Sequence, residues 1–349
     1  MVSQRLDGLD LARYLAFVGM VIVNFKIAMG VEDGSGVLMT ISTLLEGRAA
    51  ATFVVLAGIG LGLAAQRGAH DQTTRVTLKR ATFLLVIGLL NSVIFDADIL
   101  HYYAFYFLFG VLFLSATNSW LVVAIIAINA AFVAMVFVLD YDAGWNWDDY
   151  TYSGFWTPVG FVRNLFFNGW HPVIPWHSFL LTGLFLSRLA LGNRRTQIWL
   201  IITGITIFAL AEVSAFHLTR FFRWVPELSE LAGLSTTEPI PPMPLYILAG
   251  TGIALAVIGI CLLVSDVLDR IGILGVVIPA GRQTLTLYIA HILIGMGTLE
   301  VLGMLGGQSI ASAFFASLAF CALATVYALL WSRKFKRGPI EELMRKVAG

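Results

Sequence analysis

Long apolar stretches recur along the whole chain, and they constrain the fold more than any other feature. We count about ten that are long enough to cross roughly 30 Å of hydrocarbon as helices. Hydrophobic residues make up 58% of the 349 residues and charged residues 12%, so a water-soluble fold could not hide this apolar surface. The sequence therefore predicts an all-α, polytopic membrane bundle. Its spans are centred near Phe17, Ala57, Val86, Phe107, Ala130, Leu181, Ile205, Leu255, Ile292 and Phe320.

Basic residues gather after the second, sixth and last predicted spans, whereas residues 96–98 and 140–149 between them are acidic. Because cytoplasmic loops retain Lys and Arg, we expect both termini in the cytoplasm. No interval between spans could hold a separate soluble domain, so we expect one domain over residues 1–349. The expected surroundings are the lipid bilayer, with no nucleic acid partner.

The first span carries a polar seam inside an apolar helix. Arg13 and Asn24 are eleven residues apart, which returns both to one helix face, roughly 16 Å apart along the axis. Asp10 precedes Arg13 by one turn, and Lys26 follows Asn24 by two residues. Polar groups are costly in lipid, so this seam predicts a functional pathway between the two membrane surfaces.

The fourth span opens with a carboxylate and an imidazole three residues apart. Asp98 and His101 share a helix face, where Asp98 can orient His101 as a general base. The alternative is structural, with Asp98 meeting the positive end of the helix dipole. Because these groups are predicted at the outer membrane surface, we favour the functional interpretation.

Two further histidines lie before and within the sixth span. His171 is expected at the mouth of the helix and His177 just inside the membrane. No carboxylate accompanies them at ligand spacing, so we predict an acid, a base or a hydrogen-bond donor here, and no metal site. The preceding connection, residues 140–171, is rich in Trp, Tyr and Asp, which fits an interfacial aromatic belt and a sugar-binding lid equally well.

The ninth span places Thr284, Tyr288 and His291 on one face, at i, i+4 and i+7. His291 has two interpretations of equal weight, a hydrogen bond to a neighbouring helix or a catalytic role. Arg282 and Arg80, both predicted near the inner surface, are candidates for contacts with phosphates, or are charges that set topology.

The residues also resemble a known family. The stretch from Arg5 to Arg13, followed by Met20 to Asn24, is similar to the first span of heparan-α-glucosaminide N-acetyltransferase-like membrane proteins and their YeiB-like bacterial relatives. Asp98 to Tyr103, His171 to Trp176 and Gly281 to His291 resemble further blocks of the bacterial members. The order of these blocks is the stronger signal, and it spans nearly the whole chain.

The resemblance implies acyl transfer across a bacterial inner membrane. Cytoplasmic acyl-CoA, with acetyl-CoA the expected form, would donate its acyl group to a hydroxyl or amine of an extracytoplasmic sugar or glycolipid. Arg13 matches the family arginine and is assigned to CoA phosphates or to pairing with Asp10, and Asn24 matches the asparagine of the lysosomal branch. The oligomeric state, a homodimer included, stays open.

One position departs from the family pattern. Ser35 stands where the lysosomal enzyme has its catalytic histidine, and the chain has no histidine from Met1 to Ala69. Another imidazole must then serve as base, or the chemistry has been lost. An activated thioester needs a base and an oxyanion donor. We favour His101 as base, then His177, with Asn24 as oxyanion donor; the other candidates are His171 and His291.

Two other functions fit the same sequence. The polar seam and the helix breaks at Pro279 and Gly281 fit a transporter or exporter of a small or lipid-linked metabolite. Ser35 fits a catalytically silent protein that keeps the acyltransferase fold.

Overall fold

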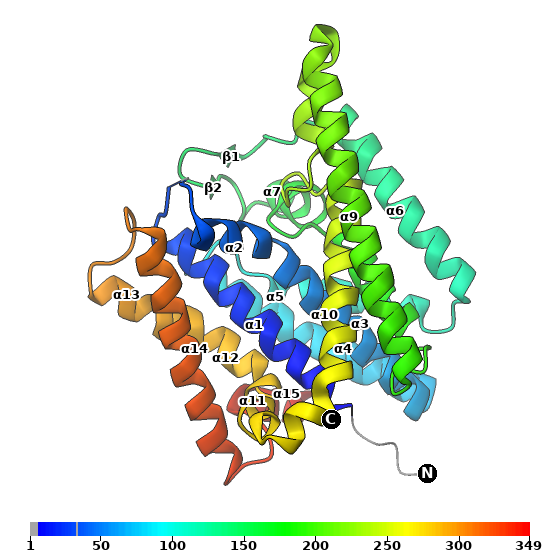
Figure 1. Cartoon of the computed structure of the whole chain (residues 1–349), viewed down its shortest axis with the longest axis vertical. Helices are drawn as coiled ribbons and strands as arrows, with labels where there is room; N and C mark the ends of the chain where they lie inside the picture. The colour runs from blue at the N-terminus through cyan, green and yellow to red at the C-terminus, as the bar shows by residue number, and fades with distance from the viewer. Residues whose placement is uncertain (1–5, 33) are drawn as a thin grey trace. The chain divides into compact units, whose positions relative to one another are not determined.

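The computed structural model describes residues 6–32 and 34–349, and nearly all their regular structure is helical (Figure 1). Within these ranges the sole strands are β1 (Trp145–Asn146) and β2 (Thr151–Tyr152), which pair antiparallel. The all-α prediction is confirmed. Arg5, which opens the family-like motif, lies outside the described residues.

The chain divides into two compact units. The first unit contains the chain up to Leu56 together with Ala190–Thr203 and Ala254–Lys346, and the second contains Ala57–Leu189 and Gly204–Ile253 with the last three residues. Four helices contribute residues to both units: α3 (Arg48–Arg67), α9 (Arg194–Trp224), α10 (Pro244–Arg270) and, by its last two residues, α15 (Pro339–Ala348). The expectation of one domain over residues 1–349 stays a prediction.

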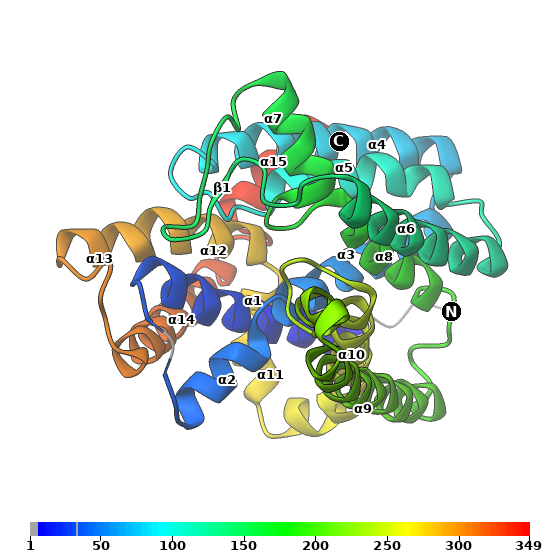
Figure 2. The same cartoon turned by 90° about the horizontal axis from the view of Figure 1, so that it is seen from above.

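Helix α1 (Asp7–Ala28) is the centre of the first unit. It contacts the helices α2, α11, α12 and α14 and the π-helix η4, which surround it in two perpendicular views (Figures 1 and 2). Two glycines permit close approach, because a Cβ at Gly8 would lie 2.6 Å from the Cα of Leu262 and one at Gly281 would overlap the carbonyl of Asp10. The other elements of this unit are α2 (Val37–Leu45), α11 (Ile273–Gly281), α12 (Thr284–Ala290), η4 (His291–Met296), α13 (Gly297–Val301), α14 (Ile310–Ser332) and α15 (Pro339–Ala348).

The second unit is built on two helix pairs, α4 with α5 and α6 with α8. Gly88 in α4 allows the first pair to pack closely, since a Cβ there would lie 2.2 Å from the backbone nitrogen of His101. The elements are α4 (His70–Asn91), α5 (Leu100–Gly110), η1 (Val111–Phe113), α6 (Asn118–Val138), the two strands, α7 (Pro158–Arg163), the π-helix η2 (Asn164–Asn168), α8 (Val173–Leu186) and η3 (Pro226–Ser235).

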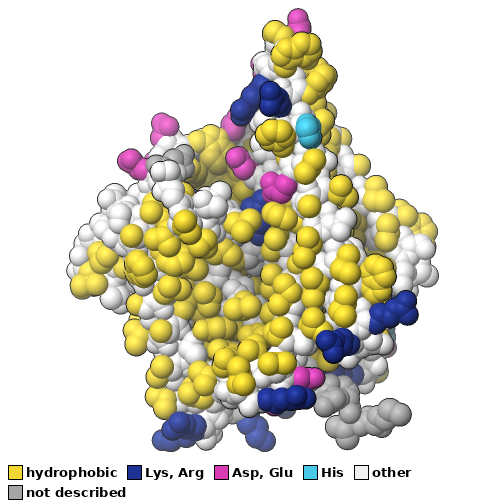
Figure 3. Space-filling view, in the orientation of Figure 1, with side chains coloured by type: hydrophobic (Ala, Val, Ile, Leu, Met, Phe, Trp, Pro, Cys, Tyr) yellow, Lys and Arg dark blue, Asp and Glu magenta, His cyan; other side chains and the backbone are white. Residues whose placement is uncertain are grey.

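Seven helical segments in the described part of the chain are long and apolar enough to cross a membrane. Hydrophobic side chains also cover most of the face drawn in Figure 3, on which charged side chains are sparse. Such a surface suits lipid contact rather than water, and an integral membrane protein is confirmed. The seven segments are Asp7–Ala28, Val37–Arg67, Asn118–Val138, Arg194–Trp224, Pro244–Arg270, Thr284–Val301 and Ile310–Ser332.

Helix α3 packs on α8 through Gly58. A Cβ at this position would lie 2.2 Å from the carbonyl oxygen of Leu180 and 2.9 Å from the Cα of Gly183, both of them backbone atoms. We therefore expect Gly58→Ala to cost about 1–3 kcal/mol of unfolding free energy through overpacking.

Thermal unfolding of the detergent-purified protein measures this effect. Gly275→Ala is the matched control, because a Cβ at this second helical glycine meets nothing within 4 Å. We expect a lower midpoint for the Gly58 variant than for the Gly275 variant, and equal midpoints would contradict close packing at Gly58.

Candidate active site

Two residues singled out from distant parts of the sequence meet in the first unit. The side-chain nitrogen Nδ2 of Asn24 lies 3.0 Å from Nε2 of His291. His291 is fully buried and opens the π-helix η4, directly after α12. Asn24 lies near the end of α1, and α1 contacts both α12 and η4. The structure therefore brings together Asn24 and His291, two of the predicted site residues.

The contacts of His291 fix which ring nitrogen carries the proton. Its Nδ1 makes a short hydrogen bond to the carbonyl oxygen of Tyr288. A carbonyl oxygen only accepts, so Nδ1 carries the hydrogen and the neutral ring presents a lone pair at Nε2. The amide of Asn24 donates to that lone pair. An oriented neutral imidazole of this kind can take a proton from a substrate that replaces the amide.

His291 is the first residue of the π-helix η4, which packs close to α1. Helix α12 ends at Ala290, and the six residues from His291 to Met296 continue with wider π-type turns. A Cβ at Gly295 would lie 2.9 Å from the ring of Phe25, so the absence of a side chain there allows η4 to approach α1. Single π-helical turns inside α-helices often occur at functional sites.

A network of charged side chains lies at the start of α1. Asp10 is buried and forms ion pairs with both Arg13 and Arg282, the second at 3.1 Å. Arg282 also contacts Asp7 at 3.0 Å. Two candidate CoA-binding arginines therefore meet on one carboxylate, which offsets part of their charge. The third, Arg80, is exposed on α4 in the second unit.

Asp98 and His101 lie together in the second unit, at the start of α5. The carboxylate of Asp98 accepts hydrogen bonds from the backbone nitrogen of Leu100 at 2.8 Å and from Asn91 Nδ2 at 3.2 Å. Its distance to His101 Nδ1 is 3.5 Å, and the hydroxyl of Ser92 lies 3.3 Å from the same nitrogen. The Asp98 carboxylate thus accepts hydrogen bonds at the positive end of α5, as the structural interpretation of this residue predicts. It also lies beside the imidazole of His101.

Two other histidines of this unit, His171 and His177, lie among aromatic rings. The ring of Tyr102 lies 3.9 Å from that of His101 and 5.8 Å from that of His171, which connects the two imidazoles. His177 is surrounded by Tyr106, Phe109 and Phe113, at ring distances of 5.9–6.5 Å. Neither ring nitrogen of His177 has a hydrogen-bond partner among the residues that the structure describes.

Burial favours the neutral form of the His171 imidazole. Desolvation by burial, with a smaller electrostatic contribution from His101, lowers the pKa of His171 to about 3. The residue keeps some exposed surface, but its Nδ1 atom is buried. At neutral pH the imidazole therefore carries no charge and can act as a hydrogen-bond donor or acceptor.

Two asparagines organise the segment between α6 and α8, and sequence reasoning gave them no role. Asn168 is buried and donates to the carbonyls of Tyr141 and Ala143, at 2.7 and 2.9 Å. Asn164 accepts from the hydroxyl of Tyr102. Both belong to the π-helix η2, which the apolar pattern of residues 164–168 does not predict. These hydrogen bonds hold the segment against the rest of the second unit. They are compatible with both an interfacial aromatic belt and a sugar-binding lid.

The predicted site residues therefore form separate groups. Within the first unit, Asn24 contacts His291, and the arginines meet at Asp10. Within the second, one cluster joins His101 with Asp98 and His171. Ser35 is exposed in the connection between α1 and α2. Across residues 6–32 and 34–349 no three His, Cys, Asp or Glu side chains are grouped to hold a metal ion.

The fold, with its long apolar helices, defines a helical integral membrane protein. The profile described as heparan-alpha-glucosaminide N-acetyltransferase, catalytic, matches residues 5–226, and that of a protein of unknown function (DUF418) matches residues 181–349. Because the first match covers more than half of the chain, the protein belongs to the heparan-alpha-glucosaminide N-acetyltransferase-like family. Comparison with curated proteins and with solved structures found no match.

Proposed function

We propose that this protein is a membrane acetyltransferase. It carries an acetyl group from cytoplasmic acetyl-CoA to a hydroxyl or amine of an extracytoplasmic sugar, glycan or glycolipid. The observation that carries the proposal is the hydrogen bond between Asn24 and His291, which joins the asparagine that resembles the family's to a buried imidazole whose neutral form has its lone pair at Nε2. The family name supports a glucosaminide-like acceptor.

The chemistry needs only a base and an oxyanion donor. His291 Nε2 takes the proton from the acceptor hydroxyl or amine, whose oxygen or nitrogen attacks the thioester carbonyl carbon. The amide of Asn24 then donates to the oxygen that becomes negative. When the intermediate collapses, the carbon–sulfur bond breaks, and the proton returns from His291 to the departing thiolate. CoA thiol and the acetylated acceptor are the products.

His291 replaces His101 as our preferred base because its tautomer is fixed and its partner is the family asparagine. His101 with Asp98, and then His177, stay candidate bases, and His171 a candidate donor. Arg13, Arg282 and Arg80 stay candidates for the CoA phosphates; the ion pairs at Asp10 also support the helix-register role of Arg13.

For topology we propose ten spans with both termini in the cytoplasm of a bacterial inner membrane. Helix α4 and the shorter apolar helices Leu100–Phe113 and Val173–Leu186 would add three spans to the seven. The distribution of Lys and Arg supports the orientation. A homodimer stays open.

The test uses purified protein in detergent with acetyl-CoA labelled in the acetyl group. Glucosamine, an α-linked glucosaminide and lipids extracted from bacterial envelopes serve as acceptors. We expect labelled acceptor and one CoA thiol released for each acetyl group transferred. A preparation that releases no thiol with any acceptor would overturn the proposal and favour the transporter or the silent protein.

A further inference from the structure

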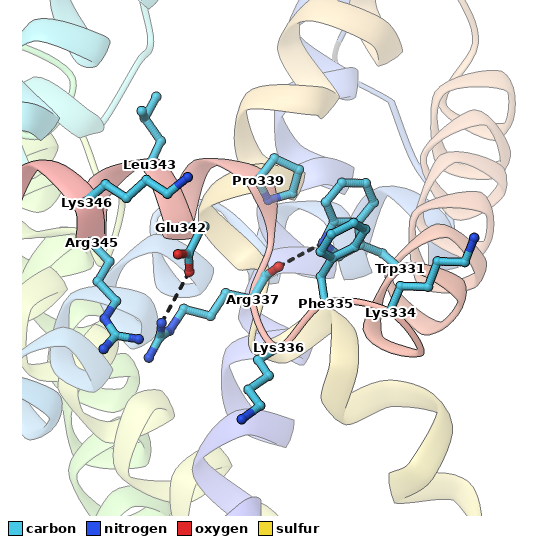
Figure 4. Close-up of a pocket in the computed structure, with 10 residues that line it drawn as sticks. All are labelled: Trp331, Lys334, Phe335, Lys336, Arg337, Pro339, Glu342, Leu343, Arg345 and Lys346. Atoms are coloured by element: carbon cyan, nitrogen blue, oxygen red, sulfur yellow. Dashed lines mark hydrogen bonds and ion pairs between the residues drawn. The ribbon is translucent and has the colours of Figure 1, made fainter.

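We propose that the end of α14 and helix α15 form a binding pocket for a phosphate ester. The pocket is a cavity of about 660 Å³ in the first unit (Figure 4). Five cationic side chains line it, from the turn after α14 and from α15: Lys334, Lys336, Arg337, Arg345 and Lys346.

The charge of this pocket is largely unbalanced. Its one acidic lining residue, Glu342, pairs with Arg337 at 3.2 Å. The four other cations have no carboxylate partner in the described part of the chain. By contrast, Arg13 and Arg282 share Asp10. An anion would therefore gain more from the C-terminal pocket than from the arginines at α1.

Aromatic side chains form another wall. Trp331 and Phe335 stack with ring centroids 4.4 Å apart, and the indole of Trp331 donates to the carbonyl of Arg337 at 2.8 Å, which closes the turn (Figure 4). Phe335 keeps 51% of its surface exposed, so a flat ring can stack on it. Helix α14 is long and apolar enough to cross a membrane and ends at Ser332, so we expect the pocket at the level of lipid phosphates.

Helix α15 is held against the helix that leads to His291. The carboxylate of Glu341 accepts hydrogen bonds from the backbone nitrogens of Leu285 and Thr286, at 2.8 and 3.1 Å, and from the Thr286 hydroxyl. These groups belong to the first turn of α12. Helix α15, which carries Arg345 and Lys346, is therefore held in place by its hydrogen bonds to α12.

Two sources could supply the phosphate: an anionic phospholipid headgroup or a soluble nucleotide such as the adenosine end of CoA. The full-length protein is therefore tested in detergent micelles with phosphatidylglycerol, by native mass spectrometry, and with labelled adenosine 3′,5′-bisphosphate, by equilibrium dialysis. The pocket variant is Lys336→Gln with Lys346→Gln. The control is Arg270→Gln with Arg333→Gln, which removes the same charge from exposed positions that do not line the pocket.

We expect at least one probe to bind the unaltered protein, and binding to weaken about tenfold or more in the pocket variant but less than twofold in the control. Phe335→Ala separates the sources, since it weakens the nucleotide through lost stacking and leaves the headgroup unaffected. Failure of both probes to bind, or equal losses in the pocket and control variants, would overturn the proposal.

Discussion

Replacing His291 by glutamine lowers the rate of acetyl transfer by about 10²–10⁴-fold, the usual contribution of a general base. Glutamine can still hydrogen-bond to the amide of Asn24, so the contact between α1 and η4 is preserved, but it cannot take a proton from the acceptor. The KM for acetyl-CoA should change little. Initial rates of CoA thiol release from purified variants measure the effect.

His101→Gln is the matched comparison, because His101 is also buried and is the base that the sequence alone favours. Both variants are first checked for the thermal midpoint of the unaltered protein. If His101→Gln abolishes turnover while His291→Gln retains it, the base lies beside Asp98 and our assignment of His291 is wrong.

Replacing Asn24 by alanine lowers kcat by about 10²–10³-fold, the typical cost of losing one oxyanion donor. The amide interacts more strongly with the negative oxygen of the intermediate than with the thioester carbonyl, so the loss falls on kcat rather than on the KM for acetyl-CoA. Steady-state kinetics at varied acetyl-CoA concentration separates the two constants.

Asn129→Ala is the control for Asn24. Asn129 is likewise a partly buried amide in a membrane-spanning helix, where it donates to the hydroxyl of Ser178 at 2.9 Å. We expect its kcat to stay within about threefold of the unaltered protein. An Asn24 variant with unchanged kcat and a raised KM would instead assign the amide to binding of the donor.

The sequence predicts the helices of this protein well because a membrane requires long apolar runs. All ten predicted centres fall in helical segments. The predicted helix break lies after Gly281, where α11 ends, and not at Pro279, which lies inside α11. Asp98 and His101 lie close together, as their spacing predicts, but the expected shared helix face is wrong, because Asp98 precedes α5 and accepts a hydrogen bond from the backbone nitrogen of Leu100 at its start.

The contacts that make the site were not predictable from the sequence. Asn24 and His291 are separated by 267 positions, and helices that are apolar on every side give no periodic signal for which faces meet. The π-helical turn at His291 has no compositional signature. The basic residues that follow α14 predicted only the topology. The cavity that they line depends on the hydrogen bonds between Glu341 and α12, and these join residues 55 positions apart, which the sequence does not reveal.

The central claim is that Asn24 and His291 act as one catalytic pair. A double-mutant cycle on kcat tests it most directly. The measurement is kcat for acetyl transfer by the unaltered protein, Asn24→Ala, His291→Gln and the double variant. Residues that act as a unit give a double variant about as slow as the slower single variant, within about threefold. Losses that multiply would show that the two side chains act independently, and would contradict the proposed site.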